Sequence, residues 1–222
     1  MPLRPITSSR DSATSNLSRF LLQIVQPLVE ETSSFVKNSK HFVDILKKVE
    51  LGPSDKFVSF EVDNLYTNVS LEESLDIVEA RLRDEVTFSE RTSLPLGGVM
   101  ELFRCCLRNS YFQVKEKFYA QNDGLPMGSP LSPVLANIYM EWFETNAISI
   151  AVVKHKIWLR YVDDAIIIWN GIDRQLDSFL NHLNSRNISI RFTIEKEKNF
   201  YLPFLDVLVS RSDGSISPHF CI

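Results

Sequence analysis

The segment RYVDDAIIIW, residues 160–169, places two adjacent carboxylates, Asp163 and Asp164, between two apolar runs. Residues 156–162 alternate and are rich in aromatic and β-branched side chains, whereas residues 165–169 form a short continuous apolar run. Runs of this length and composition are typical of strands rather than helices. The segment therefore predicts a tight β-hairpin with two acids at its tip. An ordinary polar turn is the alternative, because Asp is itself a common turn residue.

The composition limits the class of protein. Of the 222 residues, 44% are hydrophobic and 15 are Phe, which is enough for the core of one large domain or slightly more. The formal net charge of -4 gives no overall basic signal for nucleic acid, so binding of nucleic acid would require a local groove. Three cysteines without framework spacing favour a reduced, intracellular protein. No apolar run approaches the roughly 20 residues of a membrane span, so no membrane partner is expected.

The rest of the chain alternates irregularly between helical and strand-like patterns. Helices are predicted at residues 17–28, 39–49, 71–82, after Pro95 to 107, 133–143 and 173–184, and strands at 56–62, 111–121 as a hairpin, 188–194 and 203–209. Ser15 or Asn16 is predicted to cap the first helix and Ser132 the fifth, and Glu195 and Glu197 are expected on a solvated face. This pattern predicts an α+β fold with an antiparallel sheet.

Glu61, near the end of the predicted strand 56–62, can join the two hairpin acids. An antiparallel sheet can place a strand end beside a hairpin tip, so that Glu61, Asp163 and Asp164 would meet at one edge of the sheet. Neighbouring carboxylates raise each other's pKa, and Mg²⁺ or Mn²⁺ relieves this repulsion because both ions prefer oxygen ligands. Two such ions about 3.5–4 Å apart support in-line phosphoryl transfer. The sequence thus predicts a two-metal site at these three residues.

Several blocks of sequence occur in a characteristic order. They are FEVDNLYTNV at residues 60–69, GLPMGSPLSP at 124–133 and RYVDD at 160–164, with RPITS at 4–8, a block at 127–137 and LPFLDV at 202–207. The first three resemble the palm motifs of reverse transcriptases, and the others are similar to blocks of Penelope-like retroelements. The resemblance spans nearly the whole chain.

This resemblance implies a polymerase palm in which helices flank an antiparallel sheet, together with a helical remnant of the fingers. It implies a partial fingers region at residues 1–50 and a palm at 51–222, with the thumb absent. It also implies an RNA-directed DNA polymerase whose partners are an RNA template, a DNA primer and deoxynucleoside triphosphates. The implied cofactors are two Mg²⁺ (or Mn²⁺) ions, and the implied location is intracellular and nuclear.

The resemblance also implies roles for single residues. Tyr66 matches an aromatic residue that walls the sugar 2′ position and excludes ribonucleotides, with a core aromatic as the alternative. Arg4 matches a fingers arginine that grips the incoming triphosphate, with a solvated arm residue as the alternative. Gln121 and Gly124, with the loop that follows, match template and nucleotide contacts, and a glycine there would let the backbone approach a nucleotide closely.

Glu61 departs from the family pattern, which has Asp at the position five residues before the aromatic. Asp163 and Asp164 match the hairpin acids, and Asp163 is the firmer metal ligand. The Glu61 side chain is one methylene longer than Asp and reaches about 1.3–1.5 Å farther. A misplacement of about 1 Å can cost a hundredfold in rate. The alternative function is therefore a catalytically impaired fragment derived from a reverse transcriptase, acting at most as an RNA- or DNA-binding module.

Overall fold

In the computed structural model the chain forms two compact units. The residues that the structure describes are 14–29, 32–151, 155–212 and 214–220. Unit 1 comprises Met1–Val29 and Asn64–Phe143, and unit 2 comprises Glu30–Asp63 and Glu144–Ile222. Both units are thus assembled from segments that are distant in the sequence.

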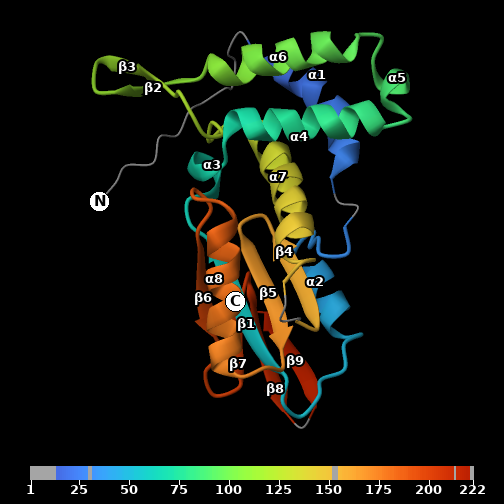
Figure 1. Cartoon of the computed structure of the whole chain (residues 1–222), viewed down its shortest axis with the longest axis vertical. Coiled ribbons are helices and arrows are strands. Elements are labelled where there is room, and N and C mark those ends of the chain that lie inside the picture. The colour runs from blue at the N-terminus through green and yellow to red at the C-terminus, as the bar shows by residue number, and fades with distance from the viewer. Residues whose placement is uncertain (1–13, 30–31, 152–154, 213, 221–222) are drawn as a thin grey trace. The chain divides into compact units, whose positions relative to one another are not determined.

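Unit 2 is built on an antiparallel sheet with the strand order β4-β5-β1-β6. The strands are β1 (Lys56–Val62), β4 (Ile157–Tyr161), β5 (Asp164–Trp169) and β6 (Phe192–Lys196). On one face, Phe60 of β1 packs edge-on against Phe179 of helix α8 (Asp173–Arg186), with ring centroids 5.9 Å apart. Figure 1 shows α8 running along this sheet. The strand predicted at residues 56–62 is confirmed as β1, in which the alternate residues Val58, Phe60 and Val62 are buried.

The opposite face of this sheet packs against a second antiparallel sheet. This sheet has the order β7-β8-β9 and consists of β7 (Tyr201–Phe204), β8 (Val207–Ser212) and β9 (Ser215–Phe220). Phe57 and Ile166 of the first sheet share a buried hydrophobic cluster with Leu202 of the second. Helix α2 (Ser39–Leu46) closes the cluster with Phe42, whose ring centroid lies 4.8 Å from that of Phe204. Glu61, near the end of β1, therefore lies on a sheet that is packed on both faces.

Unit 1 is mainly helical. Its elements are α1 (Ser15–Val25), η1 (Gln26–Leu28), α3 (Leu65–Asn68), α4 (Leu71–Asp84), α5 (Phe88–Arg91), α6 (Leu96–Arg108), the hairpin β2 (Tyr111–Val114) and β3 (Lys117–Ala120), and the residues of α7 (Ser132–Ala147) up to Phe143. Helix α6 packs against both α1 and α4 (Figure 1). Each of the three helices has buried apolar residues, among them Leu21, Leu75 and Phe103. Nowhere in the described residues is there a helix with the length and apolarity to cross a membrane.

The α+β class with an antiparallel sheet is confirmed, and two of the predicted helix caps are wrong. Ser132 does not cap α7: it is the first helical residue, and its hydroxyl donates to the carbonyl of Pro126 at 2.7 Å. Helix α1 begins after Thr14, which makes no side-chain cap, so a cap by Ser15 or Asn16 was wrong. In both cases a hydroxyl or amide residue lies one position inside the helix, because boundaries depend on packing as well as on propensity.

Two strand predictions also needed correction. Residues 203–209 are not one strand, because Leu205 has φ +52° and the chain turns there from β7 into β8. Strand β6 starts at Phe192 rather than 188, because the side chain of Asn187 accepts hydrogen bonds from the backbone N–H of Ser189 at 2.7 Å and of Ile190 at 3.3 Å. An Asn that bonds to the backbone just ahead of it favours a turn over a strand.

Candidate active site

The hairpin predicted at residues 160–169 is present, and its tip is a two-residue turn. Strands β4 and β5 pair so that Tyr161 faces Asp164, which leaves Val162 and Asp163 as the turn. Val162 has φ +55°, a conformation that is rare for a β-branched residue. A positive φ at only the first of two turn residues fits a type II′ turn, where glycine is usual. Asp163 thus lies in a strained turn and Asp164 begins β5.

Glu61 is brought beside this turn by the pairing of β1 with β5. The register sets Glu61 opposite Asp164, and the N–H of Val62 donates to the carbonyl of Asp163 at 2.9 Å. Directly opposed residues of antiparallel strands project to the same face, with Cβ atoms about 4.5–5.5 Å apart. The structure therefore gathers Glu61, Asp163 and Asp164 at one end of the sheet, and this group is called the acidic edge below.

Asp63 does not join the acidic edge through the strand pattern. Strand β1 ends at Val62, and the N–H of Asp63 donates to the carbonyl of Arg191 at 2.8 Å in the turn that follows. The charges that act on Asp164 come from Asp163 and Glu61. The acid of this segment that faces the hairpin is therefore Glu61.

The acidic edge is electrostatically crowded. The pKa of Asp164 is raised from 3.8 to about 6, first by partial burial and then by the negative charges of Asp163 and Glu61. Burial and like charges both favour the neutral form of a carboxyl group. A cation at this position would reverse both effects, because it would compensate the charge and replace lost hydration.

The chemistry of these three side chains fits Mg²⁺ or Mn²⁺. All are carboxylates, and hard divalent ions prefer oxygen ligands. In the part of the chain that the structure describes, no three His, Cys, Asp or Glu side chains are already gathered into a metal-binding cluster. Glu61 is exposed, so its side chain is able to rotate toward an ion without a change in the main chain.

A hollow of about 170 Å³ adjoins Glu61 and Asp164 within unit 2. Its lining also includes Glu195 of β6 and Leu205 at the turn between β7 and β8. Glu195 is exposed as expected, but the sequence contained no signal that would place a fourth acid here. Only the pairing of Ser59 with Glu195 brings it to this hollow.

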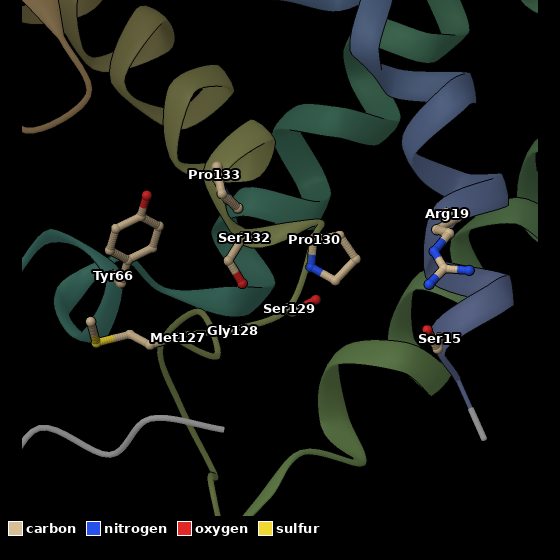
Figure 2. Close-up of a pocket in the computed structure, with 9 residues that line it drawn as sticks. All are labelled: Ser15, Arg19, Tyr66, Met127, Gly128, Ser129, Pro130, Ser132 and Pro133. Atoms are coloured by element: carbon tan, nitrogen blue, oxygen red, sulfur yellow. The ribbon is translucent and has the colours of Figure 1, made fainter. Parts of the chain in front are cut away.

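A second candidate site lies within unit 1, around the loop that precedes α7. A pocket of about 450 Å³, called the loop pocket below, is lined by Ser15, Arg19, Tyr66, Met127, Gly128, Ser129, Pro130, Ser132 and Pro133. Figure 2 shows Tyr66 and Met127 on one side of the loop and Arg19 and Ser15, both from α1, on the other. Ser129 of the loop and Ser132 at the start of α7 are buried. The pocket combines an aromatic ring, hydroxyl groups and one cationic side chain.

Gly124 allows the start of this loop to lie directly against the backbone of Tyr66 and Thr67. It has φ +78°, and a Cβ added there would lie 2.9 Å from the carbonyl oxygen of Thr67. The N–H of the next residue, Leu125, donates to the carbonyl of Tyr66 at 2.6 Å. The missing side chain of Gly124 thus leaves room for the backbone of α3, which is the close approach that only glycine permits.

Gln121 and Arg4 complete the set of predicted site residues. The side-chain amide of Gln121 donates to the carbonyl of Asp123 at 3.1 Å, and its Oε1 is buried with no hydrogen-bond partner among the described residues. Arg4 lies outside the described residues. Sequence reasoning missed Arg19, whose only signal is its place on the polar side of an amphipathic helix.

Comparison with known proteins identifies the family. The family model for reverse transcriptase (RNA-dependent DNA polymerase) matches residues 3–203. The chain is 28% identical over 120 residues to telomerase reverse transcriptase of Mus musculus, a match that covers 53% of this chain and 10% of the mouse protein.

Solved structures show the same fold. Apo telomerase from Candida tropicalis, truncated from its C-terminal domain, has a TM-score of 0.67 at 14% identity and covers 95% of this chain and 46% of that chain. Telomerase from Candida albicans has a TM-score of 0.70 at 14% identity, over 95% of this chain and 38% of that chain. The RNA-dependent RNA polymerase of BmCPV has a TM-score of 0.63 at 12% identity, and the match covers 95% of this chain and 20% of that chain.

The chain spans less than half the length of these relatives. The family model, in contrast, covers most of the chain, including both candidate sites. The protein described here belongs to the reverse transcriptase (RNA-dependent DNA polymerase) family.

Proposed function

We propose that this chain is the catalytic portion of an RNA-directed DNA polymerase of a Penelope-like retroelement. Its partners are an RNA template, a DNA primer and deoxynucleoside triphosphates, and its location is intracellular and nuclear. Family membership supports the polymerase class. The blocks at residues 4–8, 127–137 and 202–207 support the Penelope-like subtype. Residues 1–50 are assigned to a partial fingers region and residues 51–222 to the palm.

The observation that carries the proposal is the register in which Glu61 faces Asp164, with Asp163 in the adjoining turn. Reverse transcriptases generally use divalent metal ions, and we assign the binding of two Mg²⁺ or Mn²⁺ ions to Glu61, Asp163 and Asp164. When bound, such ions activate the attacking oxygen and stabilise the leaving oxygen. In the overall transfer, the primer 3′ oxygen forms a bond to the α-phosphorus, and the bond to pyrophosphate breaks.

The residues of unit 1 are assigned to the nucleotide and the template. Tyr66 walls the loop pocket (Figure 2) and would exclude a ribose 2′ hydroxyl. Gln121 offers a buried acceptor that a bound nucleotide or template base would satisfy. Gly124 would act by holding the loop against the Tyr66 backbone. The assignment of Arg4 to the triphosphate comes from the resemblance alone.

A second function, binding of RNA or DNA without turnover, is favoured by one specific observation. Glu61 stands where the family has Asp. An extra methylene shifts the carboxylate by more than two-metal catalysis tolerates at full rate, since about 1 Å can cost a hundredfold.

Primer extension distinguishes the two functions. The chain and its Glu61→Asp variant are given a primed RNA template, deoxynucleotides and Mg²⁺ or Mn²⁺. We expect Glu61→Asp to extend the primer faster, by up to about a hundredfold, because the shorter acid restores the metal geometry. Binding of the primed template is measured in parallel. Tight binding by both proteins without extension by either would reject the polymerase and leave the binding module.

A further inference from the structure

A buried ion pair lies behind the acidic edge in unit 2. The Arg160 side chain is 0% exposed and that of Glu144 is 8% exposed, and Arg160 Nε lies 2.6 Å from Glu144 Oε1. Removing two charges from water is costly, and an apolar pair of similar volume is often at least as stable. Stability alone is therefore a weak reason for this pair, and its neighbours indicate another role.

The carboxylate of Glu144 is held from several directions. The indole N–H of Trp158 donates to Oε1 at 2.8 Å, and the hydroxyl of Ser34 donates to Oε2 at 2.9 Å. The main chain of Arg160 is bonded to the same neighbouring segment, since its N–H donates to the carbonyl of Ser34 at 2.7 Å and its carbonyl accepts from Val36 at 2.9 Å. Both the base of the Arg160 side chain and its partner are thus fixed in place.

The other arm of Arg160 reaches the strained turn. Its Nη1 donates to the carbonyl of Val162 at 3.2 Å, and Val162 has φ +55°. A backbone conformation of this kind persists only where its surroundings hold it. The guanidinium group is rigid and planar. Because its Nε donates to Glu144 and its Nη1 donates to the carbonyl of Val162, it fixes the position of the turn relative to the core.

We propose that Arg160, anchored by Glu144, is a positioning residue for the acidic edge. By holding the carbonyl of Val162 it sets the direction in which Asp163 and Asp164 project. The inference rests on the proposed function only in that the direction of these carboxylates matters for metal binding and transfer. A lysine at position 160 would keep the charge but has a single ammonium group, which cannot span both acceptors in the same geometry.

The first test compares Arg160→Lys with Arg211→Lys. Arg211 is a matched control in the same unit, because its Nε lies 2.9 Å from both carboxylate oxygens of the buried Glu197, away from the turn. We expect similar losses in melting temperature for both variants. Only Arg160→Lys should speed amide hydrogen exchange in the peptide that spans residues 157–169, and only it should weaken Mn²⁺ binding, by about tenfold or more, as outer-sphere changes do.

A double variant distinguishes a positioning role of Arg160 from a role in stability alone. Glu144→Gln combined with Arg160→Met removes both charges and keeps an acceptor for Trp158, so the fold should be retained. The positioning role predicts faster exchange in the hairpin and weaker Mn²⁺ binding despite an unchanged melting temperature. Wild-type exchange and Mn²⁺ affinity in this variant would overturn the inference.

Failure of the proposed function is recognised separately. If the unaltered chain binds no Mn²⁺ and extends no primer, the polymerase assignment falls. Hydrogen exchange then decides the positioning role alone: faster exchange confined to the hairpin of Arg160→Lys supports it, and exchange equal to that of the control overturns it.

Discussion

The acidic edge of unit 2 and the loop pocket of unit 1 are assembled in opposite ways. At the acidic edge, strand pairing joins Glu61 to Asp164, which lies far along the chain. In the loop pocket, most of the lining comes from the neighbouring residues 127–133. A site formed by the pairing of two strands depends on the length and charge of each side chain. A site formed by consecutive residues of one loop depends on the local backbone conformation. The two should therefore respond differently to substitution.

Asp163→Asn tests the register-built site most severely. The substitution removes one charge at a turn that the backbone already fixes, so the fold should persist while primer extension falls by about a thousandfold or more. The matched control is Asp63→Asn, because Asp63 lies beyond the end of β1. Extension rates of the two variants are compared in the Glu61→Asp background if that background is the more active. Equal rates would show that the acidic edge is not the reaction centre.

Gly124→Ala tests the loop-built site. A Cβ would lie 2.9 Å from the carbonyl oxygen of Thr67 at φ +78°, so the variant should lose about 1–3 kcal/mol of unfolding free energy. The control is Gly97→Ala in α6. A Cβ added there would meet no heavy atom within 4 Å beyond the neighbouring residues and the backbone of the helix itself. The change should therefore be neutral or stabilise the fold by up to about 1 kcal/mol. Urea unfolding measures both. A neutral Gly124→Ala would mean that the loop is not held against α3.

Asp164 gives the acidic edge a pH dependence. Its pKa is raised from 3.8 to about 6 in the folded chain, so the folded state binds the proton more tightly than the unfolded state. The stability contributed by this group is fully present below about pH 4 and is lost as the pH rises through about 6. Asp164→Asn should therefore raise the unfolding free energy by about 1 kcal/mol near pH 7, allowing for solvent screening, and by almost nothing near pH 4.

Denaturant unfolding of this variant at both pH values is the measurement. Saturating Mg²⁺ or Mn²⁺ should narrow the difference near neutral pH, because a bound cation relieves the same repulsion in the unaltered chain. A difference independent of pH would assign the effect to packing rather than to charge.

Much of the fold was predictable because its signals are local. The strand predicted at residues 56–62 is β1, and the helix predicted from residue 71 does begin there, with Ser70 Oγ accepting from the N–H of Glu73 at 3.4 Å. The first helix, predicted over residues 17–28, ends earlier at Val25, because Pro27 cannot continue an α-helix. In each case a few neighbouring residues carry the information.

The errors share another origin. Glu197 was expected on a solvated face, but its side chain is 8% exposed and accepts from Arg211 and from the N–H of Phe57 at 2.9 Å. That expectation was wrong, because a charged residue next to a strand is buried or exposed according to what another part of the chain brings to it. The buried pair of Glu144 and Arg160 was missed for the same reason.

The sequence by itself determined where most strands and helices lie, and which acids, glycines and aromatic residues are available for chemistry. Tertiary structure alone decided that Glu61 faces Asp164, that Glu195 joins the neighbouring hollow and that Arg160 reaches the carbonyl of Val162. Periodicity is encoded over a few residues, but strand register and the partners of buried charges are selected by the packing of the whole core, which no local pattern contains.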